Sequence, residues 1–297
     1  VITNIGLGDH LGLNYITTVD ELAVVKRVIV ENVAPTGTAV LNAADPVVAA
    51  MAKHCPGSVI FFARDRMNPV LATHRAQGKR VVHAERDAIV CSTGRKKHRI
   101  PFAGIPLTRN GSIGFQVENA MAAVAAGWAL GYSWEIIERA LAGFVSDAET
   151  APGRFNVFDY KGATLIADYG HNPDAIQALV DAVDNMPAMR RSVVISGAGD
   201  RRDEDIRQQT GILGDAFDTV ILYQDACQRG RADGEVIGLL REGLAQATRT
   251  REILEITGEF LAIDTALGRL RPDDLCLMLI DQVEDALAHI ARRVAEG

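Results

Sequence analysis

Ala151-Pro-Gly-Arg-Phe155 and Asp168-Tyr-Gly-His-Asn-Pro-Asp-Ala175 are the two stretches that decide the fold of this chain. Apolar strands are expected at 155–160 and 163–168, so the two stretches lie at the two ends of a short β-hairpin. A Pro-Gly turn, two strands and a polar cluster that opens a helix would carry Arg154 and Asp168 toward one ligand. This arrangement is typical of a domain junction that delivers charged groups to a binding site.

Strands and helices alternate from this hairpin to the end of the chain. The expected further elements are strands at 192–196, 219–223, 252–256 and 275–280 and helices at 174–185, 204–216, 234–246, 259–268 and 283–294. Such alternation predicts an α/β fold of the doubly wound, Rossmann-like type, with ligands at the carboxyl ends of the strands. Residues 145–153 are polar and contain Pro and Gly, which indicates a linker. We therefore expect two domains, 1–150 and 151–297.

The first half also alternates, with one interruption. The expected elements are strands at 1–5, 39–42 and 58–62 and helices at 20–31, 46–53, 119–130 and 134–141. Between 79 and 107, short β-branched runs separated by polar turns predict a small antiparallel insertion. The first domain is therefore expected to hold a parallel sheet with a small β insertion.

Composition restricts the class of protein. The chain has 297 residues, 48% of them hydrophobic, and a net charge of −7, with basic residues dispersed except at Arg95–Arg99. We expect a globular protein without a nucleic-acid partner, and the basic run is expected to form a solvated turn. Four widely separated cysteines indicate reduced thiols in a cytoplasmic protein. The sequence contains no apolar run of about 18 residues, so no membrane span is expected.

Four residues of the first half are candidates for chemistry. Asp9 and His10 follow the first expected strand among glycines, and could hold a divalent cation near phosphate; alternatively, Asp9 caps a helix and His10 lies at the surface. Lys26 lies in an apolar helical segment, where a solvated lysine is the plainer interpretation. Asn119 could cap a helix or bond a planar base, and the position favours capping.

The second half offers a denser set. Arg154 could clamp phosphate oxygens or form an interdomain ion pair. Asp168 could accept hydrogen bonds from ribose hydroxyls. His171-Asn172-Pro173 opens a helix, where Asn172 acts as a cap or backbone N–H groups face a ligand. Two further loops, 197–205 and 225–233, carry mixed charges; they suit an amino-acid zwitterion or are simply solvated.

Taken together, these segments resemble the Mur ligase superfamily, the ATP-dependent ligases that form amide bonds in peptidoglycan and folylpolyglutamate synthesis. The motifs that carry the resemblance occur in order along nearly the whole chain: Thr3-Asn-Ile5, Asp9-His-Leu11, Lys26, Leu41-Asn-Ala-Ala-Asp45, Asn119-Ala-Met-Ala-Ala123, Pro152-Gly-Arg-Phe155 and Asp168-Tyr-Gly-His-Asn-Pro173. The loops Gly199–Asp205 and Arg229–Gly234 look most like the branch that attaches arginine to the side chains of a polyaspartate backbone.

The resemblance implies a role for each matching residue. His10 would help to bind Mg²⁺, and Lys26 matches a lysine that is often carbamylated to become a metal ligand. The remaining implied contacts are Asn119 with adenine, Arg154 with the phosphates, Asp168 with the ribose, and His171 and Asn172 with the phosphate or acyl-phosphate region. ATP would phosphorylate a carboxylate, and an incoming amine, that of arginine, would attack the acyl phosphate to give an amide.

The chain departs from the superfamily at one motif. No G-x-x-x-x-G-K-[ST] phosphate loop occurs in it, nor does the ATP-grasp module of the arginine-attaching branch. We therefore expect the chain to be an incomplete portion of a larger enzyme, whose missing N-terminal portion would be a partner, and to turn over poorly alone. A homo-oligomer is also expected. The alternatives are another Mur-type ligase, acting on a peptidoglycan precursor or on folate, and a non-catalytic module of the same fold.

Overall fold

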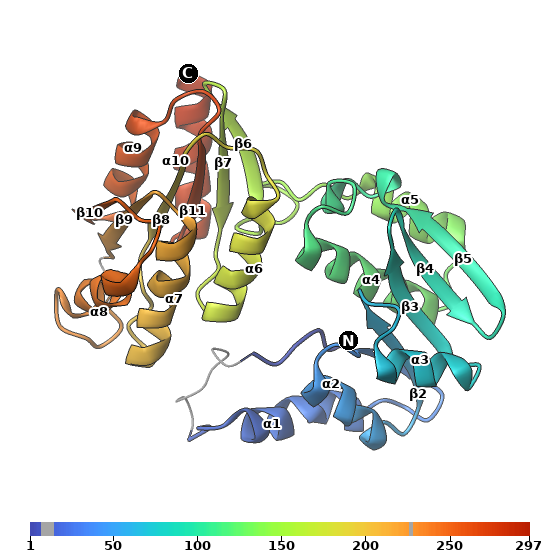
Figure 1. Ribbon diagram of the computed structural model, residues 1–297. Coiled ribbons are helices and arrows are strands. Elements are labelled where there is room, and N and C mark those ends of the chain that lie inside the picture. The colour runs from blue at the N-terminus through green and yellow to red at the C-terminus, as the bar shows by residue number, and fades with distance from the viewer. Residues whose placement is uncertain (7–14, 226–227) are drawn as a thin grey trace. The chain divides into compact units, whose positions relative to one another are not determined.

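Figure 1 shows the computed structural model of the chain, which describes residues 1–6, 15–225 and 228–297. The chain divides into two compact units, Val1–Val145 and Ser146–Gly297. Each unit has its own sheet with helices on both faces, which confirms the predicted α/β fold.

The sheet of the first unit is mixed. Its strands lie in the order β1 (Thr38–Asn42), β2 (Ser58–Ala63), β3 (Arg80–Glu85), β4 (Ala88–Thr93) and β5 (Lys96–Pro101). The first three are parallel, and β3, β4 and β5 form an antiparallel meander. The parallel sheet with a small antiparallel insertion is therefore confirmed.

Successive side chains along the strands of this sheet point to opposite faces, and each face packs into its own hydrophobic core. Val40, Ile60 and Phe62 pack with α4 (Gly114–Ala129) and α5 (Trp134–Gly143). Leu41 and Phe61 face the opposite side, where α1 (Val19–Glu31), α2 (Pro46–Ala50) and α3 (Pro69–Ala76) pack. Central strands that are buried on both faces need this unbroken apolar pattern. Short 3₁₀ turns occur at Met51–His54, Phe102–Gly104 and Pro106–Thr108.

Two predictions for this unit, one of a strand and one of a turn, are wrong. The predicted strand 1–5 is reduced to a single bridge between Ile2 and Leu41, because the backbone N–H of Ile5 donates instead to Oδ2 of Asp45 at 2.8 Å. The basic run Arg95–Arg99 is not a solvated turn. Most of it belongs to β5, whose lysines are exposed and whose Arg99 pairs with Glu85 and Asp87 of the neighbouring strands and turn.

Helix boundaries differ from prediction at two places. The helix predicted from residue 119 begins at Gly114, so Asn119 lies within the helix and does not cap it. Helix α3 was not predicted. Its start carries a readable signal, because Asn68 caps Val70 and Leu71 and Pro69 occupies the first turn.

The second unit contains a sheet of six strands. They lie in the order β10 (Glu252–Thr257), β9 (Thr219–Gln224), β8 (Arg191–Ile195), β11 (Leu275–Leu279), β7 (Ala163–Asp168) and β6 (Asn156–Tyr160). All neighbours are parallel except β6 and β7, which form the predicted hairpin. The return of β11 between β7 and β8 gives the doubly wound topology that was predicted.

Helices cover both faces of this sheet (Figure 1). On one face, α9 (Glu259–Arg269) and α10 (Val283–Glu296) pack on residues such as Leu165, Val194 and Cys276. The other helices are α6 (Pro173–Asp184), α7 (Asp203–Ala216) and α8 (Glu235–Gly243), with a 3₁₀ turn at Leu244–Gln246. Among the residues that the structure describes, no helix has the length and apolar character needed to cross a membrane.

Candidate functional site at the carboxyl edge of the second sheet

The hairpin ends on a buried carboxylate. Asp168, the last residue of β7, is 8% exposed. Its Oδ2 accepts the N–H of Phe155 at 2.8 Å, and its Oδ1 accepts the N–H of Gly170 at 2.7 Å. Burial raises the pKa of Asp168, although these two hydrogen bonds and the charges of Arg154 and His171 favour the ionised form. One carboxylate thus ties the turn before β6 to the turn after β7.

Glycine is required in the first of these turns. Gly153 has a φ of +68°, and a Cβ there would lie 2.8 Å from a methyl carbon of Val283. Its N–H donates to Asn156 Oδ1 at 2.7 Å, and its carbonyl accepts the N–H of Tyr169 at 2.9 Å. The turn therefore fixes the backbone on either side of Arg154.

Arg154 itself is exposed and is not part of an ion pair within the described chain. Its guanidinium lies over the ring of Tyr169, with Cζ 5.8 Å from the ring centroid. A ring face orients a guanidinium without neutralising its charge. Arg154 is therefore presented as a positioned cation that can still bind an anion.

His171 lies between the hairpin and the end of β11. Its Nδ1 bonds the carbonyl of Tyr169, and its Nε2 lies 3.3 Å from Oδ1 of Asp281. Gln209, which is buried on α7, donates from Nε2 to the carbonyl of His171 at 3.2 Å. The next residue, Asn172, caps α6 by accepting the N–H of Ala175 at 2.8 Å, as predicted.

Asp281 is the charge centre of this edge. Hydrogen bonding from His171, and then from Asp225, together with the positive charges of His171 and Arg229, lowers the pKa of Asp281 despite its partial burial. Arg229 Nη2 donates to Asp281 Oδ1 at 2.9 Å, and its Nη1 lies 3.5 Å from Asp200. Side chains that follow β7, β8, β9 and β11 thus meet at one edge of the sheet.

The buried carboxylate of Glu259 holds the backbone of the loop that carries Asp281. Glu259, at the start of α9, is 2% exposed and accepts the backbone N–H groups of Asp281 at 2.8 Å and Gln282 at 3.1 Å. Burial raises the pKa of Glu259, against the effect of these hydrogen bonds. Glu259 therefore fixes the loop that presents Asp281 to His171.

Arg231 braces the two charged loops against each other. Its guanidinium donates to the carbonyls of Gly199 at 2.7 Å and Arg201 at 2.8 Å and pairs with Asp203 at 2.7 Å. A Cβ on Gly199 would lie 2.0 Å from the carbonyl oxygen of Gln228, so the loops approach at backbone distance. Much of the mixed charge seen in the sequence is therefore paired within the loops.

The structure describes two of the four candidates of the first unit. Asp9 and His10 lie outside the described residues. Lys26 is half-buried in the middle of α1, and Asn119 is exposed on α4, where its Nδ2 donates to Oε1 of Gln116 at 3.1 Å. In the described part of the chain no three His, Cys, Asp or Glu side chains converge as a metal site would require. The described residues therefore supply only Lys26 of the expected metal ligands.

Sequence reasoning assigned no role to three residues of the carboxyl edge: Tyr169, Glu259 and Asp281. It placed Arg229 only within a charged loop. Asp281 follows the predicted strand 275–280 directly, so the rule that pointed to Asp168 would also have found it. Glu259 carries no such signal, because its role depends on how α9 meets the loop after β11.

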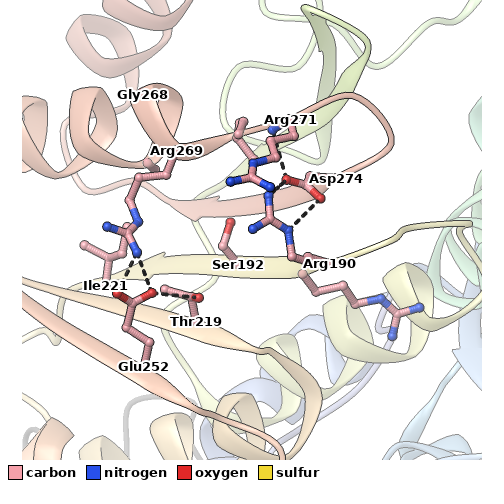
Figure 2. A pocket seen from close by; sticks show the side chains of 12 residues that line it. Arg190, Ser192, Thr219, Ile221, Glu252, Gly268, Arg269, Arg271 and Asp274 are labelled. Carbon is pink, nitrogen blue, oxygen red and sulfur yellow. Dashed lines mark hydrogen bonds and ion pairs between the residues drawn. The ribbon is translucent and has the colours of Figure 1, made fainter.

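A cavity of about 450 Å³ lies at the opposite edge of this sheet, near the amino ends of β8 and β9. Figure 2 shows that two of its arginines face carboxylates: Arg269 pairs with Glu252, and Arg190 pairs with Asp274 at 2.6 Å. Charges that are already satisfied in this way contribute to the fold. The cavity is therefore distinct from the carboxyl-edge cluster, where Arg154 has no carboxylate partner.

Comparison with known families agrees with this architecture. Residues 1–127 match the Mur ligase middle domain, and residues 153–279 match the Mur ligase glutamate ligase domain. Cyanophycin synthetase of Synechocystis sp. is 36% identical over 299 aligned residues, which cover 100% of this chain and 34% of that protein. The cyanophycin synthetase of Geminocystis herdmanii is 35% identical, with 96% and 32% covered. The chain spans about a third of the length of these curated relatives.

Solved structures share the fold at low sequence identity. Escherichia coli FolC in complex with DHPP and ADP has a TM-score of 0.67 at 18% identity, with 99% of this chain and 60% of that chain covered. MurF of Acinetobacter baumannii has a TM-score of 0.63 at 19% identity, with 99% and 59% covered. The structures show the shared fold, and the two domain models, which match residues 1–127 and 153–279, show that the chain belongs to the Mur ligase family.

Proposed function

We propose that this chain serves an ATP-dependent ligase that attaches arginine to the aspartate side chains of a polyaspartate backbone through an acyl phosphate. The observation that carries the proposal is the 36% identity to cyanophycin synthetase across the whole chain. A FolC structure of the same fold, described as a complex with ADP, supports the nucleotide class.

The carboxyl edge of the second unit has the chemistry that phosphate binding needs. Arg154 offers a planar guanidinium that forms no ion pair within the described residues, which suits bidentate bonding to phosphate oxygens. The start of α6 is capped by Asn172, and a helix N-terminus favours anions. We assign Arg154, His171 and Asn172 to the phosphate and acyl-phosphate region. A ribose contact of Asp168 would use lone pairs that its two backbone hydrogen bonds leave available.

Further assignments follow the family resemblance. Asn119 would contact adenine; its exposed position on α4 leaves its side chain accessible. His10 and a carbamylated Lys26 would hold Mg²⁺. Of these two ligands, only Lys26 lies among the residues that the structure describes. The ion would supply positive charge to the transferred phosphoryl group.

Arginine would be recognised by carboxylates of the charged loops. Asp200 and Asp281 already hold the guanidinium of Arg229, and Asp203 holds that of Arg231. These pairs show that the loops can accommodate guanidinium groups. We propose that substrate arginine competes with Arg229 for Asp200, while Asp203 remains with Arg231.

The experiment measures ADP release from ATP in the presence of three acceptor and amine pairs. We expect release with polyaspartate and arginine, and none above background with UDP-linked peptide and diaminopimelate or with folate and glutamate. Turnover by the 297-residue chain alone is expected to be slow, because its sequence contains no G-x-x-x-x-G-K-[ST] loop. Release with either other pair but not with polyaspartate would overturn the substrate assignment. Self-association, the expected homo-oligomer, is checked by light scattering on the same sample.

A second candidate is a ligase of peptidoglycan precursors. The diaminopimelate ligase of Alkaliphilus metalliredigens is 25% identical over 244 residues, covering 80% of this chain and 45% of that protein. The lower identity ranks this candidate second, and the same experiment distinguishes the two.

A further inference from the structure

The first unit contains a cavity of about 610 Å³ at the amino ends of its parallel strands. Ser58 at the start of β2, Arg80 at the start of β3 and His74 of α3 line it, together with Lys53 and Lys79 from the adjoining turns. Neither Lys26 nor Asn119, the two described residues of this unit that the proposed function assigns to Mg²⁺ and adenine, lines the cavity. The cavity is therefore separate from those residues.

The charged residues that line the cavity are all positive. Lys53, Lys79 and Arg80 are cations, and none of the lining residues carries a carboxylate. No ion pair is formed by any of the three within the part of the chain that the structure describes. The cavity of Figure 2 differs in this respect, because Glu252 and Asp274 neutralise two of its arginines. In a chain of net charge −7, three converging cations without a counter-charge need an explanation.

Arg80 is the most constrained of the three. Its Nη1 donates to the carbonyl of Trp128 at 3.3 Å, its Nη2 donates to Oγ1 of Thr38 at 3.1 Å, and Cζ lies 5.4 Å from the Trp128 ring centroid. These partners fix the guanidinium but do not neutralise it, and burial lowers the pKa of Arg80. A half-buried cation held only by neutral groups gains from any anion that enters.

The rest of the lining does not compete for an anion. His74 is 8% exposed and bonds the carbonyl of Val59 through Nε2 at 3.0 Å. Burial and the charge of Lys79 lower the pKa of His74, although the Val59 hydrogen bond acts against this. The two lysines are exposed at the rim, where they can close on a bound group.

We propose that this cavity binds a compact multivalent anion, one that carries several phosphate or carboxylate groups. Arg80 would contact it at the base, and Lys53 and Lys79 would contact it at the rim. The proposal rests on unit 1 alone and holds whether or not the ligase function assigned above is correct.

The test titrates the protein with tripolyphosphate, and separately with a short aspartate peptide, while the ring-proton NMR signals of His74 are recorded. Binding is expected to shift these signals and to raise the pKa of His74, because an anion stabilises the imidazolium. In the double variant Lys53→Gln, Lys79→Gln the affinity should fall about tenfold, since two charge-assisted contacts are lost. The tighter of the two probes identifies phosphate or carboxylate as the preferred group.

The matched control is Lys97→Gln, Lys161→Gln, which removes the same charge from exposed positions outside the cavity. It should bind within about twofold of the unmodified protein, because neither lysine lines the cavity. Equal loss in both double variants would show general charge attraction and would overturn the proposal. Failure of both probes to move the His74 signals would overturn it as well. Thermal melting of each variant confirms that the fold is retained.

Discussion

The two cavities at the amino ends of parallel strands differ in the partners of their arginines. In the second unit, Arg269 pairs with Glu252 and Arg190 pairs with Asp274 (Figure 2). Arg191 pairs with Asp184, so three of the four arginines that line this cavity form ion pairs. In the first unit, Arg80 has only neutral partners. A paired guanidinium contributes to the fold without a ligand, whereas an unpaired one at a cavity retains charge for an anion. The comparison teaches that the partner of an arginine, more than its presence, indicates whether it serves structure or binding.

The same contrast separates residues at the carboxyl edge of the second sheet. Asp168 and Glu259 are buried carboxylates whose oxygens accept backbone N–H groups. Arg154 is an exposed cation that rests on a tyrosine ring. We therefore expect substitutions of the satisfied groups to change stability, and substitution of Arg154 to change binding.

The largest effect is expected for Asp168→Asn. The amide group replaces one acceptor oxygen by an NH₂, which then faces a backbone N–H, either that of Phe155 or that of Gly170. A buried donor left without an acceptor, and the loss of a charge-assisted bond, should lower the free energy of unfolding by about 2–3 kcal/mol. Urea denaturation followed by circular dichroism measures the change.

Asp159→Asn is the matched control on the same hairpin. Asp159 is exposed on β6, and its contact with the N–H of Gly162 is long, at 3.5 Å. Its substitution should change the free energy of unfolding by less than about 0.5 kcal/mol. If the two variants were equally stable, Asp168 would not be the tie between the two turns.

The sequence predicts the strand and the helix cap of this hairpin better than it predicts the residues that contact the hairpin from other elements. The strand that ends at Asp168 and the cap at Asn172 follow from local signals, namely an apolar run and an Asn-Pro pair. Glu259 could not be found in this way, because its partners at 281 and 282 come from another element. The roles of Arg80 and Arg154 also depend on tertiary partners, and no local pattern tells a paired arginine from an unpaired one.

The errors in the first unit have similar causes. Val1–Ile5 has the composition of a strand, yet Ile5 bonds Asp45 and leaves the sheet. The start of α4 at Gly114 has no side-chain cap, whereas Asn119 is a residue type that commonly caps helices. The helix start was therefore predicted five residues too late. Local propensity is a weak guide wherever tertiary contacts decide the boundary.

An intermediate effect, dependent on pH, is expected at Asp281. Its pKa is lowered in the folded state, first by hydrogen bonding from His171. A lowered folded-state pKa gives stability that is fully present above the unfolded value of about 3.9 and is lost as the pH falls through the folded-state pKa. The difference in free energy of unfolding between the unmodified protein and Asp281→Asn should therefore be present at pH 5 and shrink below about pH 4.

The control for this series is Asp233→Asn, an exposed position on the neighbouring loop. The difference between the control and the unmodified protein should stay small throughout the pH range. Urea denaturation at each pH measures both differences. A difference for Asp281→Asn that does not shrink below about pH 4 would contradict the ionised pairing at the carboxyl edge.

The smallest effect on stability, and the sharpest test of the comparison, is expected for Arg154→Gln. The side chain is exposed, and the substitution breaks no ion pair within the described residues, so the free energy of unfolding should change by less than about 0.5 kcal/mol. Affinity for a fluorescent ATP analogue should nevertheless fall about tenfold, because a charge-assisted contact with phosphate is lost. Arg154→Lys keeps the charge without the planar fork and should lie between the two. A variant that lost stability but bound nucleotide normally would place Arg154 with the paired arginines of Figure 2, and an unpaired guanidinium would then no longer indicate a binding role.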